Sequence, residues 1–97
     1  MFIAIVKYIK PIATIDALLA DHIRFLEEQF LAGHFIASGR IVPRTGGVIL
    51  ARGPSREDVE AILYQDPFYT SGAAEYEVIE FTPTKAGRGF EILMNAN

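Results

Sequence analysis

The stretch Asp21–Arg40, with the sequence DHIRFLEEQFLAGHFIASGR, decides the fold of this chain. It holds the end of an amphipathic helix, a glycine at position 33 that suits a left-handed helix end, and a short apolar segment typical of a strand. The helix starts further upstream, because apolar residues recur at three- and four-residue spacing at Ile15, Leu18, Leu19, Ile23, Leu26 and Phe30. His22 lies four residues from both Leu18 and Leu26, so the spacing predicts a histidine on the buried side of this helix.

Strands are predicted before and after this helix in the sequence. Residues 2–9 are apolar except for Lys7, which is typical of a strand buried on both faces. Lys10 and Pro11 end that strand, and we expect Thr14 or Asp16 to cap the helix that follows. Residues 34–42 form the next predicted strand and residues 48–52 a third, joined by the turn sequence of residues 44–47.

The second half of the chain repeats the order of helix and strand. Ser55, followed three residues later by Asp58, resembles a capping box and starts a helix whose apolar face holds Val59, Ile62 and Leu63. We expect the helix to end near Asp66, because a residue before proline is driven out of helical geometry. An irregular segment then runs to Gly72, and residues 75–82 alternate acidic and apolar side chains as a strand does. Residues 83–97 form a tail that packs as an extra strand or serves a subunit contact.

The predicted order is strand, helix, strand, strand, helix, strand. This order favours a single domain over residues 1–97 with a ferredoxin-like α+β fold, a βαββαβ sandwich with a four-stranded antiparallel sheet. Both helices then cover one face of the sheet. The other face needs a second subunit, so we expect a homodimer, or a higher oligomer of such dimers, in which two sheets form a dimeric α+β barrel.

Composition excludes several kinds of partner. The net charge is −3 and the nine basic residues are scattered, so nothing predicts binding to nucleic acid or to an anionic membrane. No apolar run approaches the roughly 20 residues that span a bilayer. The first residues do not resemble a signal peptide, and the sequence has no cysteine, which suits a cytoplasmic protein.

His22 is the first candidate for chemistry. A neutral imidazole accepts a proton near pH 7, and a carboxylate on its other ring nitrogen fixes the tautomer and supports the cation that forms. The alternative is a core histidine that donates to a backbone carbonyl. The spacing alone favours this second interpretation, since periodicity does not distinguish a pocket wall from a core.

Four segments of the chain resemble the YciI-like (YCII-related) family of small dimeric α+β barrel proteins: DHIRFL, AGHFIASG, PRTGGVILA and QDPFYTSG. The resemblance spans the chain from the first strand to Thr82. It implies a His-Asp dyad at the mouth of a pocket, formed here by His22 and Asp66. It also implies a function in which a dehydrochlorinating lyase of aromatic breakdown is among the few known examples. A structural alternative for Asp66 is a turn residue, because aspartate before proline commonly starts a turn and bonds to its own local backbone.

Residues for substrate binding are predicted at Ser38, Gly39, Arg40, Arg44 and Phe68. Arginine suits a carboxylate or phosphate because guanidinium donates two parallel hydrogen bonds, although the loop position of Arg44 favours a simple exposed arginine. His22 and His34 lie twelve positions apart without a third ligand at metal-binding spacing, so no metal is expected. Residues 45–47 open a strand rather than a helix, which argues against a nucleotide cofactor.

These features support three functional hypotheses. The first is a cofactor-independent enzyme in which His22, oriented by Asp66, moves a proton in the elimination or isomerisation of a small organic molecule. The second is a small-molecule-binding or accessory module that uses the same pocket without catalysis. The third is a purely structural dimerisation unit, which a polar, open pocket at His22 would argue against.

Overall fold

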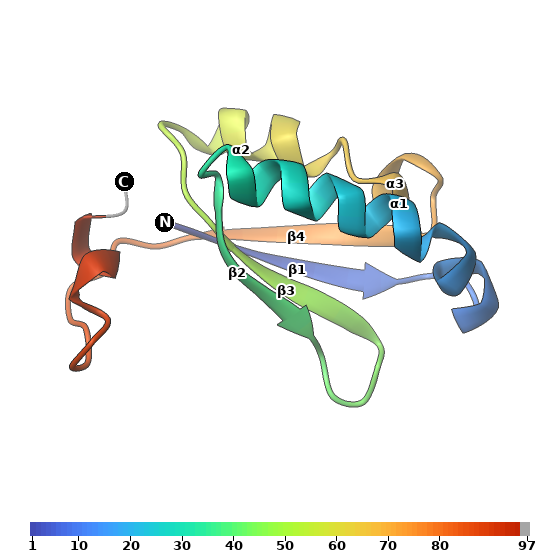
Figure 1. The fold of residues 1–97 in the computed structure, drawn as a ribbon, viewed down its shortest axis with the longest axis horizontal. Helices are drawn as coiled ribbons and strands as arrows, with labels where there is room; N and C mark the ends of the chain where they lie inside the picture. The colour runs from blue at the N-terminus through green and yellow to red at the C-terminus, as the bar shows by residue number, and fades with distance from the viewer. Residues whose placement is uncertain (96–97) are drawn as a thin grey trace.

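A computed structural model describes residues 1–95 of the chain (Figure 1). The elements in order are β1 (Phe2–Tyr8), α1 (Ile12–Leu31), β2 (Phe35–Arg40), β3 (Gly46–Ala51), α2 (Arg56–Leu63), α3 (Pro67–Thr70), β4 (Ala74–Glu80) and a 3-10 turn (Glu91–Asn95). The predicted ferredoxin-like order of strands and helices is confirmed, with α3 as an additional short helix.

The four strands form one antiparallel sheet in the order β2-β3-β1-β4. Phe2 pairs with Ala51 of β3 and with Glu80 of β4, which fixes the register of the central strand. All three helices lie on one side of this sheet, as Figure 1 shows. The core fills the space between these two layers, and its largest fully buried apolar side chains are Phe2, Phe68, Ile15, Leu63 and Val59.

Helix α1 has the predicted position and a different start. It begins at Ile12, with Pro11 as the N-cap and no side-chain cap bond, so the expected cap by Thr14 or Asp16 is wrong. Pro11 fixes its own φ near the helical value and can begin a helix without such a bond. Gly33 follows the helix with a φ of 83°, and the predicted left-handed stop is confirmed.

The buried stripe of α1 is narrower than the spacing indicates. Ile15 is fully buried, whereas Ile23 and Phe30 remain 43% and 38% exposed. Phe25, which lay outside the predicted stripe, is buried and packs edge-on against Phe35 with ring centroids 5.8 Å apart. Because the sheet is twisted, the face of a straight helix that contacts it changes along the helix. Toward the end of α1 this face includes Phe25, which packs against Phe35 of β2.

The segment after α2 differs from the expectation. Helix α2 ends at Leu63 rather than near Asp66, although Ser55 caps its start as predicted, accepting from the Asp58 amide at 3.2 Å. Residues 67–70, expected to be irregular, form α3. Asp66 is the N-cap of this helix and Pro67 its first residue, a pairing that favours helix initiation.

The face of the sheet away from the helices is uncovered. Ile3 and Ile5 of β1 are only half-buried, so the expectation that β1 is buried on both faces does not hold for the chain alone. Val48 and Ile79, which are paired in register with these residues, are 38% and 42% exposed. The tail forms no extra strand within residues 83–95 and extends away from the sheet in Figure 1.

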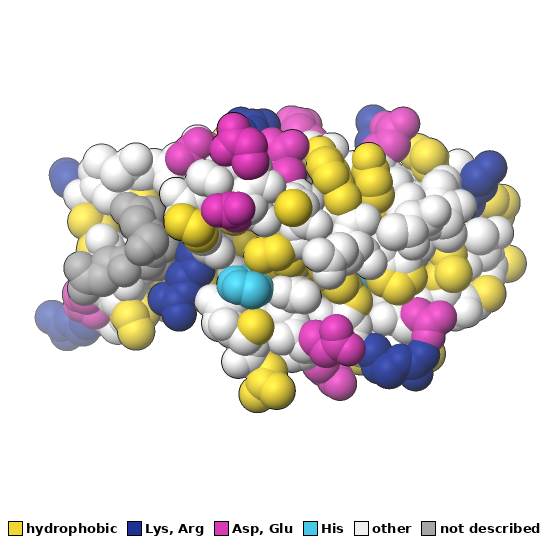
Figure 2. Space-filling model, turned by 90° about the horizontal axis from the view of Figure 1, so that it is seen from above, with side chains coloured by type: hydrophobic (Ala, Val, Ile, Leu, Met, Phe, Trp, Pro, Cys, Tyr) yellow, Lys and Arg dark blue, Asp and Glu magenta, His cyan; other side chains and the backbone are white. Residues whose placement is uncertain are grey.

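Charge is dispersed over the helical side of the molecule. Figure 2 looks onto this side and shows lysine and arginine in separate small groups between acidic and apolar side chains. No helix within residues 1–95 is both long and apolar enough to cross a bilayer.

Candidate active site

His22 and Asp66 lie in contact at the inner side of α1. The His22 Nδ1 atom lies 2.8 Å from Oδ1 and 2.9 Å from Oδ2 of the Asp66 carboxylate. The His22 side chain is 13% exposed, while Asp66 is fully buried. The histidine therefore reaches solvent and the carboxylate stands behind it. The fold brings together two residues that are 44 positions apart in the sequence.

Local structure and β4 together hold the Asp66 carboxylate. As the N-cap of α3 it accepts the Phe68 amide N–H at 3.0 Å. The Tyr76 hydroxyl, from β4, donates to the other oxygen, Oδ2. With His22, the carboxylate has three donors, as a buried carboxylate requires.

Tyr76 stays protonated in this environment. Burial is the main cause that raises the pKa of Tyr76 above its ordinary value, and the neighbouring Asp66 charge raises it further. The hydroxyl therefore remains a donor throughout the neutral pH range. This donor fixes the orientation of the carboxylate that faces His22.

The surroundings of His22 define its tautomer. Because Asp66 offers only acceptor oxygens, the neutral imidazole carries its proton on Nδ1, which leaves the lone pair on Nε2. The imidazole stacks on the Phe68 ring with centroids 3.9 Å apart and an angle of 10° between the planes. The ring is thus fixed by a hydrogen bond at one nitrogen and by a flat contact, with Nε2 left for the pocket.

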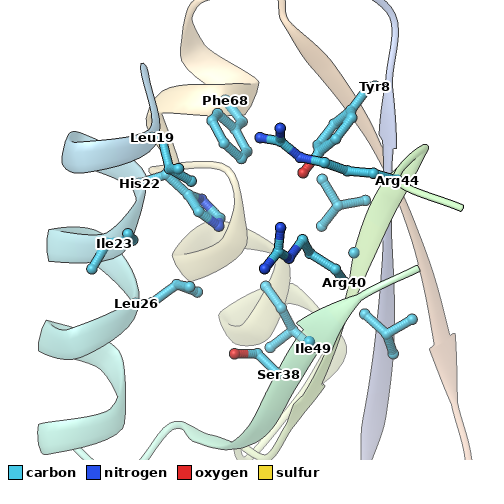
Figure 3. A pocket seen from close by; sticks show the side chains of 14 residues that line it. Tyr8, Leu19, His22, Ile23, Leu26, Ser38, Arg40, Arg44, Ile49 and Phe68 are labelled. Atoms are coloured by element: carbon cyan, nitrogen blue, oxygen red, sulfur yellow. The ribbon is translucent and has the colours of Figure 1, made fainter. Parts of the chain in front are cut away.

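A pocket of about 310 Å³ opens between α1 and the sheet (Figure 3). This volume lies near the lower end of the range for ligand sites, roughly 300–1,000 Å³, so it suits a small molecule. All five predicted substrate-binding residues line this pocket together with His22, and the apolar part of the wall is formed by Val6, Leu19, Ile23, Leu26 and Ile49. Asp66 does not line the pocket and contacts it through His22.

Two arginines enter the pocket opposite the helix. Arg40 ends β2 and Arg44 lies in the loop before β3, and Figure 3 shows both guanidinium groups directed toward the side where His22 lies. Arg44 Nη2 donates to Asp16 of α1 at 2.6 Å. This hydrogen bond, with a smaller contribution from the Tyr8 hydroxyl, raises the pKa of Arg44, which therefore stays positively charged.

Three residues of the site were absent from the prediction. Tyr76 supports Asp66, Tyr8 lines the pocket beside Arg44, and Asp16 pairs with Arg44 rather than capping the helix. A partial signal exists for Tyr76, because it stands at an inward position of an alternating strand and its hydroxyl needs a partner there. His34, by contrast, bonds to Gln29 at 2.7 Å and lines no part of the pocket.

The fold and site define a ferredoxin-like α+β protein with a histidine and a buried aspartate paired at the wall of a small pocket. The YCII-related domain family matches residues 1–82. The chain belongs to this family, as its sequence segments indicated. No curated protein sequence matches the chain significantly.

Among solved structures, the chain is similar to 5-chloro-2-hydroxyhydroquinone dehydrochlorinase (TftG) from Burkholderia phenoliruptrix AC1100, in complex with 2,5-dihydroxybenzoquinone. The TM-score is 0.69 at 20% sequence identity, and the match covers 91% of this chain and 97% of that chain. At this identity the likeness establishes a shared fold.

Proposed function

We propose that this protein is a cofactor-independent enzyme that uses His22 as a general base on a small organic molecule. The observation that carries the proposal is the His22 ring, bonded through Nδ1 to buried Asp66 while the ring lines an open pocket. A structural core histidine needs neither a buried carboxylate nor access to a cavity. General base catalysis needs both an oriented ring and a free nitrogen within reach of the substrate.

The chemistry is a proton transfer at Nε2. In an elimination, Nε2 takes a proton from the substrate, the electrons of that bond form a new double bond, and the leaving group departs with its bonding pair. In an isomerisation, the imidazolium returns the same proton to a different atom. Asp66 stabilises the imidazolium in both cases, because its negative charge faces the ring across a hydrogen bond.

The remaining pocket residues hold the substrate in this proposal. Ser38, Gly39, Arg40 and Arg44 form the side opposite α1. Phe68, whose ring face stacks on the His22 ring, also lines the pocket. The similar structure supports elimination, because that protein is named as a dehydrochlorinase. A dehydrochlorination removes a proton and chloride, and the proton is the part that a base such as His22 accepts.

The test compares the two histidines of the chain. His22→Ala and His34→Ala each remove one imidazole, and only the first removes it from the pocket. With 5-chloro-2-hydroxyhydroquinone as the first substrate offered, we expect His22→Ala to lower turnover by about 10²–10⁴-fold, the usual contribution of a general base. His34→Ala should turn over at the wild-type rate. Wild-type turnover by His22→Ala contradicts the proposal, and tight binding of the compound by the wild-type protein without any conversion favours a non-catalytic binding module.

We also propose that the chain forms a cytoplasmic homodimer through the uncovered sheet face. Ile3, Ile5, Val48 and Ile79 present apolar surface there, which a second copy would bury by symmetric packing. Ile79→Glu should therefore convert the dimer to a monomer in sedimentation velocity. Leu31→Glu, at an exposed position on the helical side, is the matched control. A wild-type protein that sediments as a monomer contradicts this assembly.

A further inference from the structure

An unsatisfied donor marks one side of the pocket. Within residues 1–95, Arg44 Nε is the buried side-chain nitrogen or oxygen that has no hydrogen-bond partner. Another nitrogen of the same guanidinium, Nη2, donates to Asp16. Buried donors are almost always satisfied in folded proteins, so a lone unsatisfied one at a pocket wall indicates an acceptor that arrives with a ligand.

Arg40 adds a second cation to the same wall. No hydrogen bond or ion pair to its side chain occurs within the described part of the chain, and it is solvent-exposed at the end of β2. Its charge is thus uncompensated, while that of Arg44 is partly balanced by Asp16. Two guanidinium groups on one wall, of which only that of Arg44 is paired with a carboxylate, favour an anion on this side of the pocket.

From this arrangement we propose that the ligand of the pocket is a small organic anion whose charged group, a carboxylate or an enolate-type oxygen, binds between Arg40 and Arg44. This inference deepens the proposed function by naming the substrate class. The anionic oxygen accepts from Arg44 Nε and from the Arg40 guanidinium, a geometry in which arginine surpasses lysine. The organic body then points toward His22.

The apolar wall requires that organic body. Leu19, Ile23 and Leu26 from α1 face Ile49 of β3 across the pocket, so the space beyond the arginines is lined by hydrocarbon. A bare inorganic anion leaves this surface in contact with water and gains nothing from it. A ring or chain carried by the anion removes that surface from water and gains affinity in proportion to the area buried.

Asp16 acts as an internal competitor in this arrangement. Its carboxylate occupies Arg44 Nη2 and balances part of the charge that the ligand needs. The Asp16 side chain is 53% exposed, so it can turn into solvent when a ligand anion takes its place. Neutralising Asp16 should consequently increase anion affinity, an effect opposite in direction to the loss of either arginine.

The experiment measures binding of benzoate, benzamide and inorganic phosphate to the full chain by calorimetry at low salt and pH 7. Benzoate and benzamide share a shape and differ in charge. We expect benzoate to bind at least about tenfold more tightly than benzamide, as charge-assisted hydrogen bonds allow, and more tightly than phosphate. Arg40→Gln and Arg44→Gln should each weaken benzoate about fivefold or more, and Asp16→Asn should strengthen it about threefold. Arg24→Gln, which removes a charge on the exposed side of α1, is the matched control and should bind benzoate as wild type does.

The outcomes separate this inference from the proposed function. Equal affinity for benzoate and benzamide, or unchanged benzoate affinity in both arginine variants with native thermal melting, overturns the anion site and leaves His22 catalysis standing. Tighter binding of phosphate than of benzoate overturns the organic class of ligand. Benzoate binding retained within about threefold in His22→Ala supports an anion site that does not depend on the base, since its binding groups are the arginines.

Discussion

The replacement of Asp66 by asparagine tests how the site depends on one buried carboxylate. The carboxylate accepts from three donors: the His22 ring, the Phe68 amide and the Tyr76 hydroxyl. An asparagine of the same shape keeps one oxygen and puts an NH₂ group in place of the other. Whichever way the amide turns, one donor meets N–H instead of oxygen.

The magnitude follows from this count. A hydrogen bond to a charged acceptor contributes about 1.5–3 kcal/mol, so losing one should lower the free energy of unfolding by about 2 kcal/mol. For a domain of this size that lowers Tm by roughly 8–16 °C. When the NH₂ group faces His22, Nδ1 becomes the acceptor and the ring proton moves to Nε2. The free base is then lost from the pocket, and turnover should fall by about 10²–10⁴-fold.

Urea denaturation and turnover assays of Asp66→Asn measure both effects. Asp21→Asn, a change of the same kind on the exposed side of α1, should alter stability by less than about 0.5 kcal/mol and leave turnover unchanged. If Asp66→Asn unfolds at the wild-type urea concentration and retains wild-type turnover, Asp66 neither supports the fold nor orients the histidine, and the reasoning is refuted.

Two further predictions concern the sheet beneath the site. Gly46→Ala should lower the free energy of unfolding by more than about 3 kcal/mol, because its Cβ would overlap the carbonyl oxygen of Val6 on the adjacent strand. Gly39→Ala is the control, because a Cβ there meets no atom within 4 Å, and it should lower the same quantity by less than about 1 kcal/mol in a urea titration. Tyr76→Phe should lose less stability at alkaline pH than the wild-type protein does. Burial and Asp66 raise the pKa of Tyr76 in the folded state. The contribution of Tyr76 to the free energy of unfolding is therefore constant below the unfolded pKa of about 10 and declines as the pH rises beyond it. Unfolding free energies measured from pH 8 to 11.5 that fall equally in both proteins contradict this origin.

The fold was predictable because the hydrophobic spacing and the glycine and proline residues that end the elements indicate the same order. The apolar run of β1, the helical spacing around His22 and the left-handed Gly33 each indicate the element that the structure contains. The errors in the placement of helices lie at the start of α1 and after α2, whereas the buried face of α1 and the burial of β1 differ within the elements. Helix α1 begins after Pro11, and the helix at residues 67–70 begins with Pro67 after the N-cap Asp66. Hydrophobic periodicity does not show whether a proline ends one element or begins a helix.

The candidate site was predictable only in part. The resemblance to a family pointed to His22 and Asp66, whereas the spacing alone favoured a core histidine. No sequence signal separates an inward-facing Tyr76 that supports Asp66 from one that merely fills the core. The pairing of Asp16 with Arg44 joins a helix to a loop 28 positions away, and such contacts follow from the fold rather than from local pattern.

The central claim is that His22 presents an unprotonated Nε2 to the pocket because Asp66 holds the proton on Nδ1. Nitrogen-15 and proton NMR of the wild-type protein with labelled histidine, recorded at a pH where the ring is neutral, identifies the tautomer directly. The structure predicts a protonated Nδ1 and a bare Nε2 for His22. A His22 ring that carries its proton on Nε2 in the free wild-type protein would contradict the account.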